Sequence, residues 1–170
     1  RLLFPREPSR MMRMSPRVLV AALVLLVPEW GASPSSLPEL LSELSGAKSV
    51  VYVGSYLRHP QVAQALHRLV TKQGGTVALL TSPYTYLDKA SYFLGLYLAG
   101  AYLYLGPVDE YFLIVNNQVA FRGRGLGASG PLERLEGEEV AAALARVREA
   151  LRRSSPFLYS PEAIVLHFWR

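Results

Sequence analysis

The chain has 170 residues, of which 51% are hydrophobic and 18% are charged, and it contains no cysteine. A chain of this length and composition can bury the core of one domain, so a disordered chain is excluded. The lack of cysteine excludes disulfide bonds, thiol nucleophiles and thiolate metal ligands.

The formal net charge of +5 is concentrated near the N-terminus. Residues 1–32 hold five arginines and two glutamates, so removing them takes the chain from 18 basic and 13 acidic residues to 13 and 11, a net charge of +2. The rest of the chain is therefore nearly neutral. Its charge does not support a nucleic-acid partner.

An uninterrupted apolar run, Val18–Val27, follows Arg13 and Arg17. A basic flank before a short apolar run is typical of a secretory signal peptide, and the run is shorter than the ~20 residues that span a bilayer. We expect an exported protein, periplasmic or secreted, in which residues 1–32 form an N-terminal extension and signal peptide. Trp30 fits poorly with cleavage after Ala32, so an uncleaved segment that anchors the protein to a membrane stays open, as does a buried core helix.

The first half of the remaining chain predicts a short helix and then a strand–helix–strand unit. Leucines at helical spacing predict a helix at Leu37–Leu44, after a polar linker at Ser33–Ser36. Two β-branched stretches, Lys48–Tyr56 and Thr76–Thr81, predict strands. An amphipathic helix that begins near Pro60 connects them, and this spacing is typical of a parallel βαβ unit.

The second half predicts a further helix and strand, a hairpin, and a long C-terminal helix. Asn116-Asn117 marks the hairpin turn, because asparagine tolerates the left-handed backbone that a tight turn needs. Acidic residues at the start of the last helix and arginines at its end match the helix dipole. The predicted elements are a helix at Lys89–Leu98, strands at Ala101–Leu105, Tyr111–Val115, Gln118–Phe121 and Leu132–Leu135, and a helix at Glu138–Arg153.

This element order resembles one half of the phospholipase D superfamily. The resemblance covers most of residues 47–153 and rests on local patterns: VVYVGSY followed by a helix near His59, and an Ala-Gly–strand passage at Ala99–Leu105. Val108–Gly123 falls where that family carries H-x-K-x4-D followed by G-S or G-G. The resemblance implies an α/β fold, a phospholipase D-like mixed sheet flanked by helices, in one domain at residues 47–153. Residues 33–46 would be a linker and short helix, and residues 154–170 a tail in which Ala163–Trp169 could pair as an edge strand.

The resemblance implies a degenerate motif. The family's nucleophilic histidine falls on Asp109, its lysine on Tyr111 and its acidic partner on Asn116. Such catalysis needs one imidazole to attack phosphorus and another to protonate the leaving oxygen. Asp109 beside Glu110 would instead repel a phosphodiester.

Other residues of the same region are candidates for binding. Arg122 and Arg124, around the retained Gly123, could hold a phosphate-containing ligand, although such arginines are more often solvated hairpin ends. Tyr84 and Tyr86 sit in a loop near the expected cleft, and Glu133 could correspond to the family's downstream acid. We expect no cofactor and no metal, because His59, Asp88, Asp109 and Glu110 lack regular ligand spacing. GLGASG at Gly125–Gly130 matches a dinucleotide fingerprint only literally, since no helix follows it directly.

Three functions remain open. The favoured one is a non-catalytic domain that acts in binding or assembly, with a homodimer through the family's active-site face. The second is a phosphodiesterase or phospholipase that uses non-standard residues, Asp109, Tyr111, Arg122 and Arg124. The third is a membrane-surface protein held by its uncleaved apolar segment.

Overall fold

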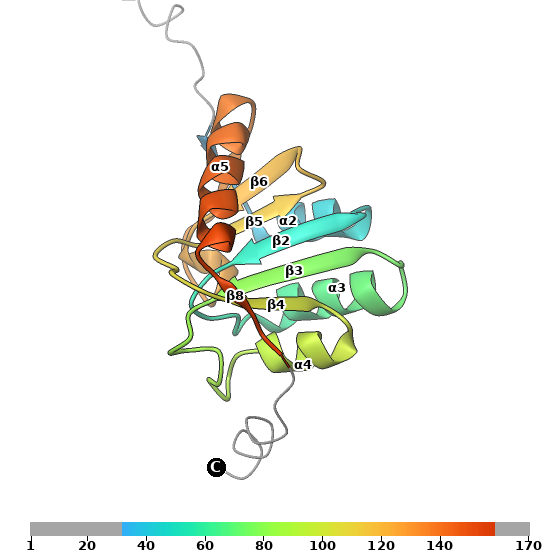
Figure 1. Ribbon diagram of the computed structural model, residues 1–170. Coiled ribbons are helices and arrows are strands. Elements are labelled where there is room, and N and C mark those ends of the chain that lie inside the picture. The colour runs from blue at the N-terminus through green and yellow to red at the C-terminus, as the bar shows by residue number, and fades with distance from the viewer. Residues whose placement is uncertain (1–31, 159–170) are drawn as a thin grey trace, which may run out of the picture. The chain divides into compact units, whose positions relative to one another are not determined.

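The computed structural model describes residues 32–158, which form a mixed sheet of eight strands with helices on both faces (Figure 1). The strand order is β1-β7-β6-β5-β2-β3-β4-β8. The strands are β1 (Ala32–Pro34), β2 (Ser49–Val53), β3 (Thr76–Thr81), β4 (Tyr102–Leu105), β5 (Phe112–Val115), β6 (Val119–Arg122), β7 (Glu133–Leu135) and β8 (Ser155–Pro156). The α-helices are α2 (Leu37–Ser45), α3 (Pro60–Thr71), α4 (Phe93–Ala99) and α5 (Glu138–Arg152), and a short 3-10 helix covers Arg124–Leu126.

The centre of the sheet is the predicted βαβ unit, extended by one strand. β2 pairs with β3 and β3 with β4, both in parallel, and α3 and α4 provide the crossovers. The remaining pairs are antiparallel. The expected α/β fold, a mixed sheet flanked by helices, is confirmed.

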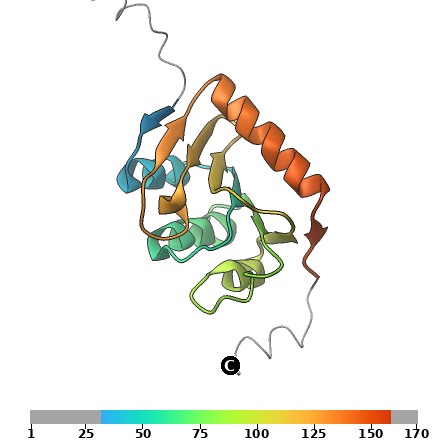
Figure 2. The same cartoon turned by 90° about the vertical axis from the view of Figure 1, so that its left-hand side faces the viewer.

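The helices divide unequally between the two faces of the sheet. α2, α3 and α4 pack on one face around a cluster that includes Tyr52, Leu66 and Phe93, each buried completely. On the other face α5 packs on β5 and β6 through Val140, Ala143 and Val147. Figure 2 shows the sheet between these two layers, with α5 lying alone on its side.

The β5–β6 hairpin turns where the sequence predicts. Asn116 and Asn117 have φ angles of 52° and 57°, the left-handed backbone of a two-residue hairpin turn. The side chain of Asn116 also accepts hydrogen bonds from the backbone N–H groups of Lys48 (2.8 Å) and Ser49 (3.0 Å). This residue therefore joins the hairpin to the beginning of β2.

Three predictions of local structure differ from the fold. Part of the predicted linker forms β1, because residues 32–34 pair with β7 along the sheet edge. The helix predicted from Lys89 begins only at Phe93, since Ser91 donates a hydrogen bond to Asp88 and the segment turns before the helix starts. β8 follows α5, within the predicted tail. The predicted signal peptide and the strand at Ala163–Trp169 lie outside the described residues.

None of the helices between residues 32 and 158 is long and apolar enough to cross a lipid bilayer.

Candidate functional site

The carboxyl ends of β2, β3 and β4 meet at one edge of the sheet, where the loops that follow them gather. Ligand sites of open α/β sheets lie beyond this edge. The loop after β2 brings Tyr56 and Arg58 there, and the loop after β3 brings Asp88. The amino end of β5 adds Tyr111.

Tyr111, which the sequence resemblance aligns with the family's lysine, fills a slot between two glycines. A Cβ atom added to Gly54 or to Gly127 would overlap the ring of Tyr111. The two glycines therefore leave the space that the ring occupies. The GLGASG stretch thus serves packing here, since Gly127 belongs to it.

A hydrogen-bonded frame holds the loops around this slot. The backbone N–H of Arg58 donates to the carbonyl of Gly127 at 2.6 Å, which joins the loop after β2 to the glycine-rich corner. The hydroxyl of Tyr52 donates to the carbonyl of Tyr56 at 2.7 Å, and burial raises the pKa of Tyr52 well above its ordinary value.

Arg58 connects two of the loops. Its Nε donates to Oδ2 of Asp88 at 2.8 Å, and the hydroxyl of Ser91 donates to the same oxygen at 2.9 Å. The hydrogen bond from Arg58 is the largest cause of the lowered pKa of Asp88. The guanidinium of Arg58 also lies over the ring of Tyr56, 4.0 Å from its centroid, a cation–π contact.

The hydroxyl of Tyr111 lies within electrostatic reach of two arginines. Burial, the largest cause, raises the pKa of Tyr111, while the charges of Arg58 and Arg124 lower it by smaller amounts. Arg124 is exposed and forms no ion pair with any residue in the range 32–158. The cluster of Tyr111, Arg58 and Arg124 is hereafter called the Tyr111 cluster.

The other candidates at the glycine corner are engaged with each other or with the backbone. Arg122 donates to Oε2 of Glu133 through Nε (3.0 Å) and Nη2 (2.7 Å), across the β6–β7 pair. Gly123 has φ of 129°, and an added Cβ would collide with the carbonyl oxygen of Pro131. Arg122 therefore has a carboxylate partner of its own, whereas Arg124 has none among residues 32–158.

The two candidate loop tyrosines differ in environment. Tyr86 packs on Phe157, with ring centroids 5.5 Å apart, and so belongs to the core. Tyr84 is 94% exposed at the tip of the loop. The pair does not line one groove.

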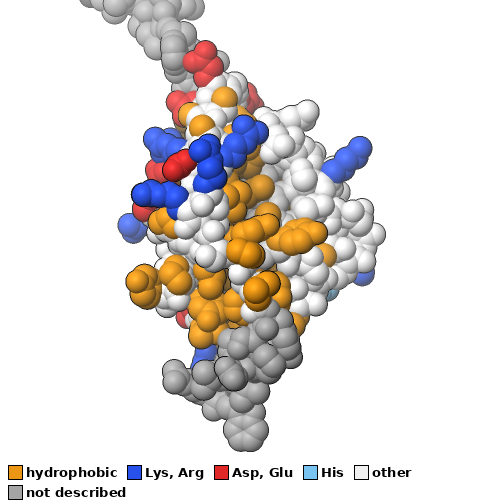
Figure 3. Space-filling model, in the orientation of Figure 1, with side chains coloured by type: hydrophobic (Ala, Val, Ile, Leu, Met, Phe, Trp, Pro, Cys, Tyr) orange, Lys and Arg blue, Asp and Glu red, His pale blue; other side chains and the backbone are white. Residues whose placement is uncertain are grey.

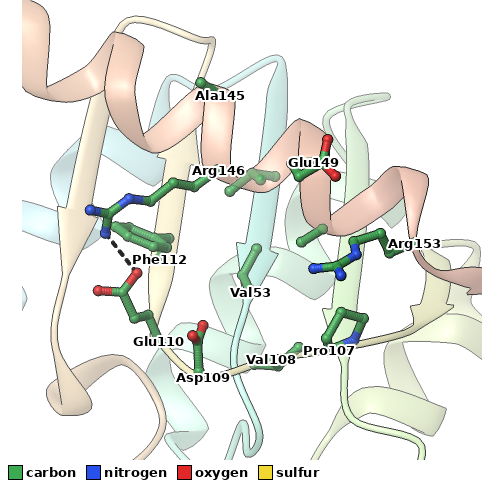
Figure 4. A pocket seen from close by; sticks show the side chains of 12 residues that line it. Val53, Pro107, Val108, Asp109, Glu110, Phe112, Ala145, Arg146, Glu149 and Arg153 are labelled. Atoms are coloured by element: carbon green, nitrogen blue, oxygen red, sulfur yellow. Dashed lines mark hydrogen bonds and ion pairs between the residues drawn. The ribbon is translucent and has the colours of Figure 1, made fainter.

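Asp109, which the sequence resemblance aligns with the family's histidine, lies on the other face of the sheet. It lines a groove of about 790 Å³ between α5 and the loop before β5, shown in Figure 4. Val53 and Phe112 contribute apolar side chains to this groove, and Glu110 pairs with Arg146 at 2.8 Å along its side. Tyr111 packs instead against the core under α2, α3 and α4.

The three residues that the sequence resemblance aligns with the family's motif are thus separated. Asn116 lies at the far end of β5 and bonds the start of β2, Tyr111 fills the slot at the near end, and Asp109 lines the groove under α5. Of the histidines, His67 is exposed on α3, and His59 lines a smaller cavity of about 370 Å³ beside Gly125 and Pro131. His167 lies outside the described part of the chain.

No group of three or more histidine, aspartate and glutamate side chains between residues 32 and 158 is arranged to hold a metal ion. The four residues weighed for such a site are dispersed. Asp88 pairs with Arg58, and Glu110 pairs with Arg146.

Sequence reasoning missed Arg58 and Tyr56. The signal that could have found them is their place directly after the first strand of a parallel pair, since such loops gather at the carboxyl edge of the sheet. The partner loop at Asp88 was weighed only as a metal ligand.

This arrangement of sheet, crossovers and hairpin defines a phospholipase D-like fold. The structure is similar to that of Nuc from Salmonella typhimurium, a phospholipase D family member, with a TM-score of 0.58 and 15% identity over 76% of this chain and 96% of that one. It is also similar to phosphatidylserine synthase of Haemophilus influenzae Rd KW20, with a TM-score of 0.51 and 12% identity over 78% of this chain. The chain spans 39% of the synthase.

No family model matches the sequence, and no curated protein matches it. The two structural similarities confirm the sequence-based resemblance to the phospholipase D superfamily at the level of the fold.

Proposed function

We propose that this chain is an exported phospholipase D-like domain protein with a degenerate, non-catalytic site, and that it acts in binding or assembly. The observation that carries the proposal is the position of Tyr111. Its ring fills the slot between Gly54 and Gly127, at the residue that the sequence resemblance aligns with the family's lysine.

The chemistry of the Tyr111 cluster supports binding more than catalysis. A phenol is nucleophilic as phenolate, and burial raises the pKa of Tyr111, which disfavours the phenolate at neutral pH. A neutral hydroxyl near the exposed guanidinium of Arg124 is instead a donor set for an anion, whereas Arg58 is already paired with Asp88. The ligand class that fits it is a phosphate-containing group, held by Arg124.

The groove under α5, which Asp109 lines, offers no better catalyst than the Tyr111 cluster. Asp109 and Glu110 place two carboxylates at the groove under α5, and Arg146 neutralises only Glu110. A phosphodiester would approach the carboxylate of Asp109 there, which has no ion pair within the range 32–158. The alternative of a hydrolase that uses Asp109, Tyr111, Arg122 and Arg124 is weaker still, because Arg122 is paired with Glu133.

The test uses the full chain with bis-p-nitrophenyl phosphate as substrate and inorganic phosphate as ligand. We expect no hydrolysis above the buffer rate, and phosphate should raise the thermal unfolding midpoint. Arg124→Gln should abolish that rise. Arg148→Gln removes the same charge from an exposed position on α5 and should keep it.

Two results would overturn the proposal. Hydrolysis that disappears in Asp109→Ala or Tyr111→Phe would make the site catalytic. If phosphate no longer raised the unfolding midpoint of either Arg124→Gln or Arg148→Gln, the rise would be a general effect of charge and not binding at the Tyr111 cluster. Sedimentation of the same samples would show whether two copies associate, as assembly through this edge requires.

A further inference from the structure

On the face of the sheet that carries α5, no helix within residues 32–158 covers the parallel strands β2, β3 and β4. The register aligns Ala120, Ile114, Val51, Ala78 and Tyr102 in one row across β6, β5, β2, β3 and β4. Exposure rises along this row with distance from α5. Ala120 is 0% and Ile114 is 1% exposed, Val51 and Ala78 are partly exposed, and Tyr102 is 59% exposed.

The neighbouring positions extend this surface to the edge of the sheet. Tyr104 lies on the same face and pairs with Pro156 of β8. Phe157, the first residue after β8, is buried against Tyr86 and Tyr97 on the opposite face. If the backbone continues extended past β8, alternation puts Leu158, 78% exposed, on the open side. The surface formed by Val51, Ala78, Tyr102, Tyr104 and Leu158 is called the open face.

The open face is apolar and contiguous. None of its five residues is charged, and Figure 3 shows hydrophobic side chains gathered over the strands below α5. Parallel strands are normally covered on both faces, because crossovers place helices on each. Here α3 and α4 both lie on the other face, with α2, so the parallel half of the sheet needs a further cover.

The chain itself carries a suitable cover directly after β8. We propose that Ala163–Trp169 packs on the open face. Six of the seven residues of this segment, AIVLHFW, are apolar. The four residues 159–162 separate it from Leu158, and four extended residues span about 13 Å, whereas β2 lies two strand spacings, about 10 Å, from β4.

The other apolar run of the chain is poorly placed for this role. Val18–Val27 is joined to β1, which lies at the opposite edge of the sheet. Six strand spacings, about 29 Å, separate β1 from β4, and the four residues 28–31 cover about 13 Å at most. Proximity therefore selects the C-terminal segment.

Disulfide trapping tests the proposal, because the chain has no cysteine of its own. Ala78→Cys on the open face is combined in turn with Ile164→Cys, Leu166→Cys and Phe168→Cys in the full chain. The matched control replaces Ala78→Cys by Gln61→Cys, an exposed position on α3 on the other face. At least one tail position should crosslink to position 78 within one chain at least tenfold faster than to position 61.

Three outcomes would overturn the proposal. Equal crosslinking rates to positions 78 and 61 would mean that the segment has no preferred site. Crosslinks between two chains of the single Ala78→Cys variant would mean that a second copy covers the open face. Failure of every pair, with reactive tail thiols, would mean that the segment lies elsewhere.

A measurement on the unmodified chain keeps the test independent of folding of the variants. Tetranitromethane nitrates accessible tyrosines. Tyr84 and Tyr102 are both exposed in the described part of the molecule, at 94% and 59%. If the segment covers the open face, Tyr84 should be nitrated and Tyr102 protected; rates in proportion to these exposures would contradict the proposal.

Discussion

The ring of Tyr111 fits where it does because Gly54 and Gly127 have no side chains. A flexible, charged side chain at position 111 would have to bring its ammonium group close to Arg58 and Arg124, or leave the slot empty. Lysine, the residue that the sequence resemblance aligns with this position, is therefore disfavoured by this chain's own neighbours.

Restoring the family's lysine should consequently destabilise the domain. We expect Tyr111→Lys to lower the free energy of unfolding by about 2 kcal/mol, from lost packing and from a poorly solvated like charge. Tyr111→Phe keeps the ring in the slot and should cost less than half as much. Urea unfolding followed by circular dichroism measures both, and a lysine variant as stable as the phenylalanine variant would contradict this account.

Single residues of the site were predicted unevenly from sequence, for a physical reason. The turn residues Asn116 and Asn117 were predicted because their conformational preference is local. The partner of Arg122 was not, because the contact with Glu133 depends on the β6–β7 register, which the intervening glycine-rich corner sets. Arg58 was missed because its importance comes from Gly127, far away in sequence.

At the scale of elements, the β5–β6 hairpin is tied to β2 at its turn. Asn116 and Asn117 share the same left-handed backbone, but only the side chain of Asn116 bonds to Lys48 and Ser49 among the described residues. Comparing substitutions at these two positions therefore distinguishes the free energy of backbone strain from that of the side-chain hydrogen bonds.

Substitution by alanine should reveal that difference. Both Asn116→Ala and Asn117→Ala pay for a left-handed alanine, about 1 kcal/mol each. Asn116→Ala also leaves two backbone N–H groups without this acceptor, which should add about 1–2 kcal/mol. Chemical denaturation gives both values, and equal losses would show that the side-chain bonds contribute nothing.

Helices and strands were predicted best where their periodicity is complete. β3 matches the predicted Thr76–Thr81, and α3 begins at the predicted Pro60. α4 was predicted too early because the residues from Lys89 are compatible with a helix, while the bonds of Asp88 that prevent one come from Arg58 and Ser91. β1 was missed because a three-residue strand has too few side chains to show alternation.

Over the whole molecule, the Arg58–Asp88 pair links the loops after β2 and β3 and should shape stability against pH. The pKa of Asp88 is lowered from its ordinary value of 3.8, so the folded state prefers the ionised carboxylate. Its contribution to stability is therefore fully present above pH 3.8 and is lost as the pH falls through the lower pKa of the folded state.

Asp88→Asn should remove this dependence. The variant should be less stable than the parent at pH 7, and the difference between their urea midpoints should shrink below pH 3.8. Asp109→Asn, which removes an exposed carboxylate that has no ion pair among residues 32–158, is the control for the loss of charge. A difference for Asp88→Asn that persists unchanged to pH 2.5 would refute the assignment.

The short strand β1 would also constrain the order of events during the proposed export. Cleavage after Ala32 would cut the peptide bond between two residues that pair with Leu135 and Arg134. A peptidase needs that stretch of backbone free for its own cleft, and the folded sheet already holds it. Under the proposed export, removal of the signal peptide at this bond would therefore have to come before β1 pairs with β7, and a chain that folded first would keep residues 1–32.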